Sequence, residues 1–302
     1  MKKILFATTA LVATASVAAA DVTFGGYARF GIMYDGAADS TDITSRLRLQ
    51  IDATAESDAG VEFGAMARIE QNNTDAGAHN GGMGPTTGPA GTGINGVRFF
   101  ARSGGLEVGV GNIYGALEFM PGQYPVDMGL TGLGYDYVAY NFRGDLYSSG
   151  GNGAAGSNGI EVMYSMGDFS AHVSASDTSD RIAAVGAYNW NGWTAALGVQ
   201  DSDNAADTEW TVSVGGDIGP ATVGLAWADN GTAGDHWVLS GRFDVGAATN
   251  VEAYIADADY FADTSYGVDF NHDLGGGTSL RGGVVSNQNG DTNADFGVRF
   301  NF

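Results

Sequence analysis

The stretch Ser45-Arg-Leu-Arg-Leu-Gln-Ile-Asp-Ala-Thr-Ala-Glu-Ser-Asp-Ala-Gly-Val-Glu-Phe-Gly-Ala-Met-Ala-Arg-Ile-Glu70 alternates between apolar and polar side chains. The period of two runs from Leu47 to Ala55 and resumes at Val61. Between these runs, residues 57–60 read Ser-Asp-Ala-Gly, which is typical of a turn. Successive side chains of a β-strand point to opposite faces. The stretch therefore predicts two strands joined by a tight turn, each with one apolar and one polar face.

The same unit recurs along the rest of the chain. An earlier segment from Asp21 places Phe24, Phe30 and Ile32 on one parity. Further segments follow near 94–102, 105–111, 159–166, 168–176, 181–190, 192–201, 207–217, 219–229, 235–244, 248–257, 260–271, 278–286 and 292–302. With the first three strands they make about sixteen, which predicts an all-β chain.

The connections between these segments alternate in length. Tight turns are expected at residues 103–105, 166–168, 189–192 and 217–219. Longer polar loops are expected at 35–43, 71–93, 201–207, 229–235 and 287–291. An antiparallel barrel with short turns at one rim and long loops at the other produces this alternation. A soluble sandwich gives no reason for it.

One segment, about 112–158, departs from the alternation. It holds several aromatic residues, Arg143 and four acidic residues: Glu118, Asp127, Asp136 and Asp145. An irregular insertion of this length is uncommon in a compact domain and is usually functional. We interpret it as a long third loop that folds back into the barrel and narrows its lumen.

The N-terminus has the features of a secretory signal peptide. Lys2 and Lys3 precede an apolar run, and residues 18–20 are Ala-Ala-Ala before Asp21. The expected division is a signal peptide at 1–20 and a barrel at 21–302. No later run approaches the roughly 20 apolar residues that a membrane-spanning helix needs. The chain has no cysteine, so it is not a small disulfide-stabilised scaffold.

The expected mature chain is strongly acidic. Both lysines lie in the signal peptide, so 11 arginines face 35 acidic residues, a formal charge of 11 − 35 = −24. This charge argues against binding to nucleic acid through a basic surface. Two readings of the acidity stay open and are compatible: solubility or halotolerance, and a surface or pore that favours cations.

The two faces of the strands indicate a membrane. Ten arginines lie outside the long insertion, and all ten fall on the polar parity: Arg29, Arg46, Arg48, Arg68, Arg98, Arg102, Arg181, Arg242, Arg281 and Arg299. An arginine facing lipid at the midplane costs about 2–4 kcal/mol. Any half-buried sheet would also avoid this placement, so aromatic residues are the stronger indicator. Tyr188, Trp190 and Trp193 flank one tight turn, while Trp210 and Trp237 lie near long loops, as in two interfacial belts. Ordinary core aromatics are the alternative.

The last strand ends in an aromatic residue, Phe302, and repeats the alternation through Phe296, Val298 and Phe300. A terminal strand frays unless it is tied down. Closure against the first strand would tie it and would remove an open edge that lipid does not tolerate. The prediction is a transmembrane antiparallel β-barrel.

Several motifs resemble one family. They are Asp21-Val-Thr-Phe-Gly-Gly-Tyr-Ala-Arg-Phe-Gly-Ile-Met-Tyr-Asp-Gly36, Ser45-Arg-Leu-Arg-Leu49, Asp58-Ala-Gly-Val-Glu-Phe-Gly-Ala65 and Asp273-Leu-Gly-Gly-Gly-Thr-Ser-Leu-Arg-Gly-Gly-Val284. They and the final strand look like the trimeric general diffusion porins of alphaproteobacteria, of the Rhodobacter type. Gly111-Asn-Ile-Tyr-Gly-Ala116 reads as the entry of the family's third loop. The middle strands match only in pattern.

The resemblance implies a sixteen-stranded homotrimer in the lipid bilayer of a Gram-negative outer membrane, with a third loop that forms a constriction. It implies insertion by the barrel assembly machinery, which reads a C-terminal aromatic such as Phe302. It makes Gln71–Gly93 the candidate second loop that latches onto a neighbouring subunit. Several family members bind calcium near the constriction, which offers Glu118, Asp127 or Asp136 as ligands in a pore that otherwise requires no cofactor. Family constrictions often include wall lysines, which this chain lacks.

The expected site is a constriction of opposed charges. A basic wall comes from the first four strands: Arg29, Arg46, Arg48, Arg68, Arg98 and Arg102. Of these, Arg46, Arg48 and Arg98 are expected at the narrowest zone. Across the lumen stand the loop acids Glu118, Asp127 and Asp136, and opposed charges of this kind orient dipolar solutes and sort ions. The alternative is that the arginines pair with wall acids such as Asp52, Glu62 and Glu70.

The predicted function is passive diffusion of ions and small hydrophilic solutes through an outer-membrane porin. A solute-selective channel is the alternative within transport, and a non-conducting structural or adhesive barrel is the alternative outside it. A barrel hydrolase would need Ser/His groups, for which His172 with Ser170 or Ser174, and His236 with Ser240, share a parity. Such pairs arise by chance in sheets of this composition, so no enzyme activity is expected.

Overall fold

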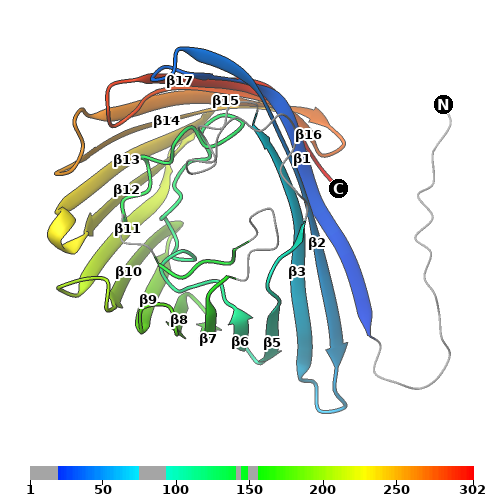
Figure 1. Cartoon of the computed structure of the whole chain (residues 1–302). Helices are drawn as coiled ribbons and strands as arrows, with labels where there is room; N and C mark the ends of the chain where they lie inside the picture. The colour runs from blue at the N-terminus through cyan, green and yellow to red at the C-terminus, as the bar shows by residue number, and fades with distance from the viewer. Residues whose placement is uncertain (1–19, 75–92, 141–143, 149–155) are drawn as a thin grey trace, which may run out of the picture.

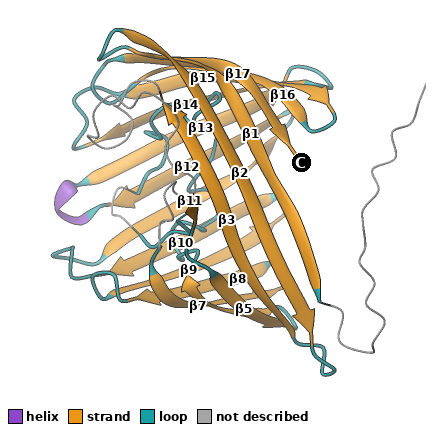
Figure 2. Ribbon diagram, turned by 45° about the vertical axis from the view of Figure 1, so that its right-hand side comes forward, coloured by secondary structure: helices purple, strands orange, loops and turns teal. Residues whose placement is uncertain are grey.

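A single antiparallel sheet closes on itself into a barrel around a hollow centre (Figure 1). The structure, a computed structural model, describes residues 20–74, 93–140, 144–148 and 156–302. The proposed signal peptide at 1–20 lies outside these residues except for its last residue, and so does most of the proposed latch at 71–93. The strands cross the barrel obliquely (Figure 2).

Seventeen strands are present in the described parts of the chain. They are β1 Asp21–Asp35, β2 Ser40–Glu56, β3 Glu62–Thr74, β4 Gly93–Ile94, β5 Arg98–Ser103, β6 Leu106–Asn112, β7 Asn158–Met166, β8 Phe169–Ser176, β9 Arg181–Trp190, β10 Trp193–Asp201, β11 Glu209–Ile218, β12 Ala221–Asp229, β13 Asp235–Asp244, β14 Thr249–Ala258, β15 Ser265–Gly275, β16 Thr278–Ser286 and β17 Thr292–Asn301.

The strand count agrees with a sixteen-stranded barrel. Both β4 and β5 pair with β3, through Ile69 with Ile94 and through Met66 with Arg98, so they form one wall strand interrupted at 95–97. The interruption has a cause in side-chain bonding, because the Asn95 Oδ1 accepts the Arg68 N–H at 2.6 Å. The prediction of about sixteen antiparallel strands is therefore confirmed.

Closure joins the two ends of the chain. β1 pairs with both β2 and β17, and Arg29 lies in register with Arg46 on one side and Arg299 on the other. The last residue takes part, because the Phe302 N–H donates to the Gly26 carbonyl at 3.1 Å and the Gly26 N–H donates back at 3.0 Å. No open sheet edge remains along this seam, as lipid requires.

One predicted strand boundary is wrong by several residues. The expected strand 260–271 begins only at Ser265 and continues to Gly275. Residues before it bond to other loops instead of to a ladder. The Ala262 and Asp263 N–H groups both donate to the Gln288 carbonyl, and the Asp259 carboxylate accepts the Asp235 N–H at 3.0 Å. Apolar parity alone could not detect this loop-to-loop bonding.

The apolar parity faces outward, away from the lumen. Leu47, Leu197 and Leu239 are each between 45% and 49% exposed although they sit in the middle of long strands. Large aromatics on the same face are also exposed, including Trp190 at 64%. A soluble barrel would bury these side chains inside, whereas a membrane barrel presents them to lipid. In the described parts of the chain, no helix has the length and apolar character needed to cross a membrane.

The outward face predicts a depth-dependent response to charge. Leu239→Arg, in mid-strand, should destabilise the folded barrel by about 2–4 kcal/mol, whereas Ile218→Arg, at a strand end beside a tight turn, should cost about 0–1 kcal/mol. Urea unfolding of the protein refolded into phospholipid vesicles measures both values. Equal costs at the two positions would contradict an outward face that spans lipid.

Candidate functional site

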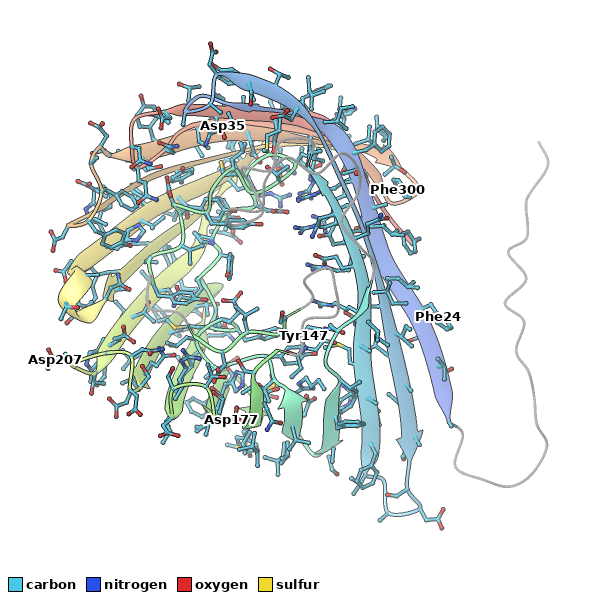
Figure 3. The ribbon with its side chains drawn as sticks, viewed as in Figure 1. Phe24, Asp35, Tyr147, Asp177, Asp207 and Phe300 are labelled. Atoms are coloured by element: carbon cyan, nitrogen blue, oxygen red, sulfur yellow. The ribbon has the colours of Figure 1, made fainter. Side chains whose placement is uncertain are left out.

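The described residues between β6 and β7, at 113–140, 144–148 and 156–157, lie inside the barrel against its wall (Figure 3). Tyr147, on this loop, lies beside the central opening, while Phe24 and Phe300 point outward from the wall (Figure 3). A loop inside a barrel must satisfy its backbone N–H groups without strand partners. Here side chains of the wall accept hydrogen bonds from the loop N–H groups.

The loop begins against β7 and β8. The buried Glu161 carboxylate accepts the N–H groups of Tyr114 at 3.0 Å and Gly115 at 3.2 Å, and the Ser174 hydroxyl accepts that of Ala116 at 3.0 Å. Further along, the Ser213 hydroxyl on β11 donates to the Pro121 carbonyl at 2.5 Å.

Wall carboxylates on β14, β15 and β17 hold the next part of the loop. Glu252 accepts the Asp127 N–H at 2.9 Å, and Asp269 accepts the Gly129 N–H at 2.7 Å. Asp295 accepts the N–H groups of Leu130 at 2.8 Å and Thr131 at 2.7 Å. Charge-assisted bonds of this kind are stronger than neutral ones.

A glycine in the loop, Gly129, allows the backbone to lie close to the Asp295 carboxylate. Gly129 has φ +61°, and a Cβ there would lie 2.2 Å from the Asp295 Oδ1. Any other residue would be strained in this backbone conformation and would displace the carboxylate.

The later described residues of the loop bond to other parts of the wall. The Asp136 carboxylate is buried and accepts the Gln288 N–H at 2.8 Å and the Ser265 hydroxyl at 3.0 Å. Asp145 accepts from Arg181 on β9 at 2.7 Å. The Tyr147 hydroxyl donates to the Met66 carbonyl on β3 at 3.2 Å.

Six arginines on five neighbouring strands, β16, β17, β1, β2 and β3, form a basic wall opposite this loop. We define the basic wall as Arg29, Arg46, Arg48, Arg68, Arg281 and Arg299. Arg29 and Arg46 line a cavity of about 350 Å³ together with loop residues Thr131 and Tyr135. The wall meets the loop at Leu130, whose carbonyl accepts from the Arg29 Nη1 at 2.6 Å.

Tyr27 keeps several of these guanidinium groups apart. Its ring is faced by the guanidinium carbons of Arg48 at 5.3 Å and Arg299 at 4.3 Å, and its hydroxyl accepts from the Arg46 Nη1 at 3.2 Å. Arginine stays protonated when crowded, so such a cluster keeps its charge. One acid of the wall, Glu70, offsets part of this positive charge, because it pairs with Arg48 at 2.5 Å.

Two of the expected wall arginines lie elsewhere. Arg98 is only 1% exposed, enclosed beneath the loop entry, and is bonded to Glu161 and Glu107 at 2.6 Å each. Its position differs from the expected narrowest zone because the loop covers it. Arg102 is 51% exposed next to the turn at 104–105 and pairs with Glu62 at 2.6 Å. The alternative of pairing with wall acids therefore describes Arg102 with Glu62, and Arg46 and Arg48 with Glu70. Arg98 pairs with two other wall acids.

The three expected loop acids have different surroundings. Asp127 is exposed and pairs with Arg281 at 2.6 Å and Arg299 at 3.3 Å. Glu118 accepts the Tyr124 hydroxyl at 2.6 Å and also that of Tyr140. It lines a cavity of about 990 Å³ toward the long-loop rim. Asp136 is occupied by Ser265 and Gln288, so the structure brings only Asp127 to the basic wall.

Two arginines of the basic wall, Arg281 and Arg299, lie outside the first four strands, where the alternation predicts the wall. Both have the same polar parity as the other four. The closure of the last strand against the first is a signal for them, because it puts β17 beside β1 and β16 next to β17.

The residues proposed for calcium do not fit that ion. Calcium takes six to eight oxygen ligands from one cluster. Here Asp127 binds a guanidinium group, Glu118 binds a tyrosine hydroxyl and Asp136 binds a backbone N–H group. Across the described residues, no group of three or more His, Cys, Asp or Glu side chains is arranged to hold a metal ion.

The residues suggested for a hydrolase have other partners. The His172 Nε2 lies 2.9 Å from Glu161, and the Ser174 hydroxyl is bonded to the loop. His236 pairs with Tyr260, and the Ser240 hydroxyl donates to the Gly224 carbonyl at 3.3 Å.

Three comparisons place this barrel among known proteins. A family model described as Gram-negative porin matches residues 7–292. A porin of Fuscovulum blasticum is 32% identical over 315 residues, and one of Rhodobacter capsulatus is 28% identical over 320 residues; each match covers 93% of this chain and 100% of the relative. The solved structure of a triple mutant of the Rhodopseudomonas blastica porin has a TM-score of 0.81 at 31% identity, with 93% of this chain and 100% of that one covered.

The buried loop acid predicts a pH dependence of stability. Burial raises the pKa of the Asp136 carboxyl, although the Gln288 N–H and the Ser265 hydroxyl act to lower it. A raised folded-state pKa gives a stabilisation that is complete below the unfolded pKa of about 3.9 and is lost as pH rises through the folded value. Asp136→Asn should therefore gain thermal stability relative to wild type between pH 4 and pH 8, measured as the difference in unfolding midpoint. Asp58→Asn, in an exposed turn, is the control, and a difference that is constant with pH would contradict the prediction.

Proposed function

The chain belongs to the family of Gram-negative porins, and from this premise we propose that it admits ions and small hydrophilic solutes through a constricted, water-filled outer-membrane channel. One observation carries the proposal: six arginines on adjacent strands stand beside an inserted loop in a barrel with a hollow centre. Members of this family are channels rather than enzymes, and the partners of His172 and His236 support the same view for this chain.

The proposed constriction is the basic wall on one side and loop residues Glu118 and Asp127 on the other. Arg46 and Arg48 stay in their expected place within it, and Arg281 and Arg299 take the place expected for Arg98 and Arg102. Opposed charges in a narrow lumen set up a transverse field that aligns dipolar solutes and slows large apolar ones. The overall negative charge would attract cations at the rims, while the basic wall favours anions at the narrowest point.

Assembly follows from the same premise. The chain is exported by the signal peptide at 1–20, inserts into the bilayer and forms a homotrimer. The barrel assembly machinery recognises Phe302, whose backbone seals the seam with Gly26. The latch assigned to 71–93 would contact a neighbouring subunit. Phe302→Ala should then reduce the amount of heat-modifiable trimer in outer membranes without changing the amount of chain exported.

Single-channel recording in a planar bilayer with a salt gradient tests the function. Large ohmic steps, often in threes, are expected from the purified oligomer. Steps that saturate with one solute would favour the solute-selective alternative. Silence from a folded, heat-modifiable oligomer would overturn the proposal in favour of the non-conducting barrel.

Neutralising the centre of the basic wall should change the ion preference. A unit charge acts on an ion at 4 Å in water with about 1 kcal/mol, a factor of about five in local concentration before salt screening. The double variant Arg46→Ala/Arg48→Ala should therefore shift the anion-to-cation permeability ratio toward cations by about two- to fivefold. The reversal potential measures this shift. Arg242→Ala, on β13 outside the basic wall, should leave the ratio unchanged, and an equal shift in both variants would contradict the assignment.

A further inference from the structure

A buried carboxylate on β7 is connected to the edge of the channel by an unbroken series of contacts. We propose that Glu161 is the positioning residue of the constriction, fixing the entry of the inserted loop and so holding the aromatic edge of the pore in place. The inference rests on the proposed channel function, which it deepens by naming the group that keeps the bore constant.

Glu161 has four partners within hydrogen-bond distance. Its Oε1 accepts from the Arg98 Nε at 2.6 Å, and its Oε2 accepts the N–H groups of Tyr114 at 3.0 Å and Gly115 at 3.2 Å. The fourth is the His172 Nε2, 2.9 Å from Oε2, which must donate because an ionised carboxylate only accepts. Glu161 is 1% exposed, so no water replaces a lost partner.

Strands β5, β6 and β7 leave space for this cluster at Gly109. Arg98 on β5 reaches Glu161 on β7 across the intervening strand β6, at Gly109, which lies in register with Glu161. A Cβ at Gly109 would lie 2.5 Å from the Arg98 Nη2 and 2.8 Å from the Glu161 Oε1. A side chain at this position would therefore separate the ion pair.

A series of aromatic contacts connects this cluster to the edge of the pore. The Arg98 guanidinium lies 4.0 Å from the centre of the Tyr114 ring, and that ring stacks on Phe119 at 4.3 Å. Tyr114 also contacts Tyr147 at 5.9 Å between ring centres. The Tyr147 ring in turn is faced by Arg68 of the basic wall at 4.6 Å. Displacement of the loop entry would therefore move the side of the opening that faces Arg68.

The neighbouring Glu107 separates two explanations. It also binds Arg98, from Oε1 to Nη2 at 2.6 Å, but in the described structure it accepts no bond from the loop backbone. If Glu161 only balances the charge of Arg98, then Glu161→Gln and Glu107→Gln should behave alike. If Glu161 holds the loop, only Glu161→Gln should affect the channel.

Single-channel recording at constant voltage compares the two variants with wild type. Losing bonds to a charged acceptor should raise the fraction of time in altered conductance levels by about tenfold in Glu161→Gln, with wild-type behaviour in Glu107→Gln. Hydrogen exchange followed by mass spectrometry supplies a second readout, because amides 114–115 should exchange faster in Glu161→Gln alone. Steady wild-type steps and wild-type exchange in Glu161→Gln would overturn the proposal.

A second variant covers the case in which Glu161→Gln does not assemble. Gly109→Ala keeps every charge but places a methyl group between Arg98 and Glu161, and it should produce the same unsteady conductance. If neither variant yields a heat-modifiable oligomer, Glu161 is a determinant of folding and the positioning role is rejected. If wild type itself is silent, the channel function fails, and the exchange rates at 114–115 still decide whether Glu161 holds the loop.

Discussion

Backbone hydrogen bonding is the constraint on which this structure depends. In lipid every N–H and C=O must be paired inside the protein, so strands can cross a membrane only in a closed sheet. The pairing of β1 with β17 closes the sheet, and Phe302 extends the ladder to its end. The inserted loop obeys the same rule without strand pairing, because carboxylates of the wall accept its N–H groups.

That arrangement engages several acidic side chains of the wall. Glu161 on β7, Glu252 on β14, Asp269 on β15 and Asp295 on β17 all bond to the loop. The basic wall occupies strands β16 to β3, where the loop contacts it through Leu130 and Asp127 and a cavity lies beside Arg46. A chain with a large net negative charge thus presents six arginines on adjacent strands inside the barrel, because several inward acids are already bonded to the loop. Net charge alone is a poor guide to the field inside such a channel.

The predictable part of the site was the parity of the side chains, and the unpredictable part was the path of the loop. Arg46 and Arg48 stand where alternation placed them. Arg98 has the same parity but is covered by the loop entry, and Asp136 bonds to the turn after β16 instead of to an arginine of the basic wall. Nothing in the local sequence distinguishes Asp127, which reaches Arg281, from Asp136, which does not.

The alternation and the turn signals were enough to predict an antiparallel barrel of about sixteen strands with one apolar face. These are local properties, since a period of two and a turn signal are read within a few residues. Tertiary structure alone decided which charges meet across the lumen. Asp127 and Arg281 are 154 residues apart, and their contact requires both the closure that brings β16 beside the first strands and the wall carboxylates that steer the loop.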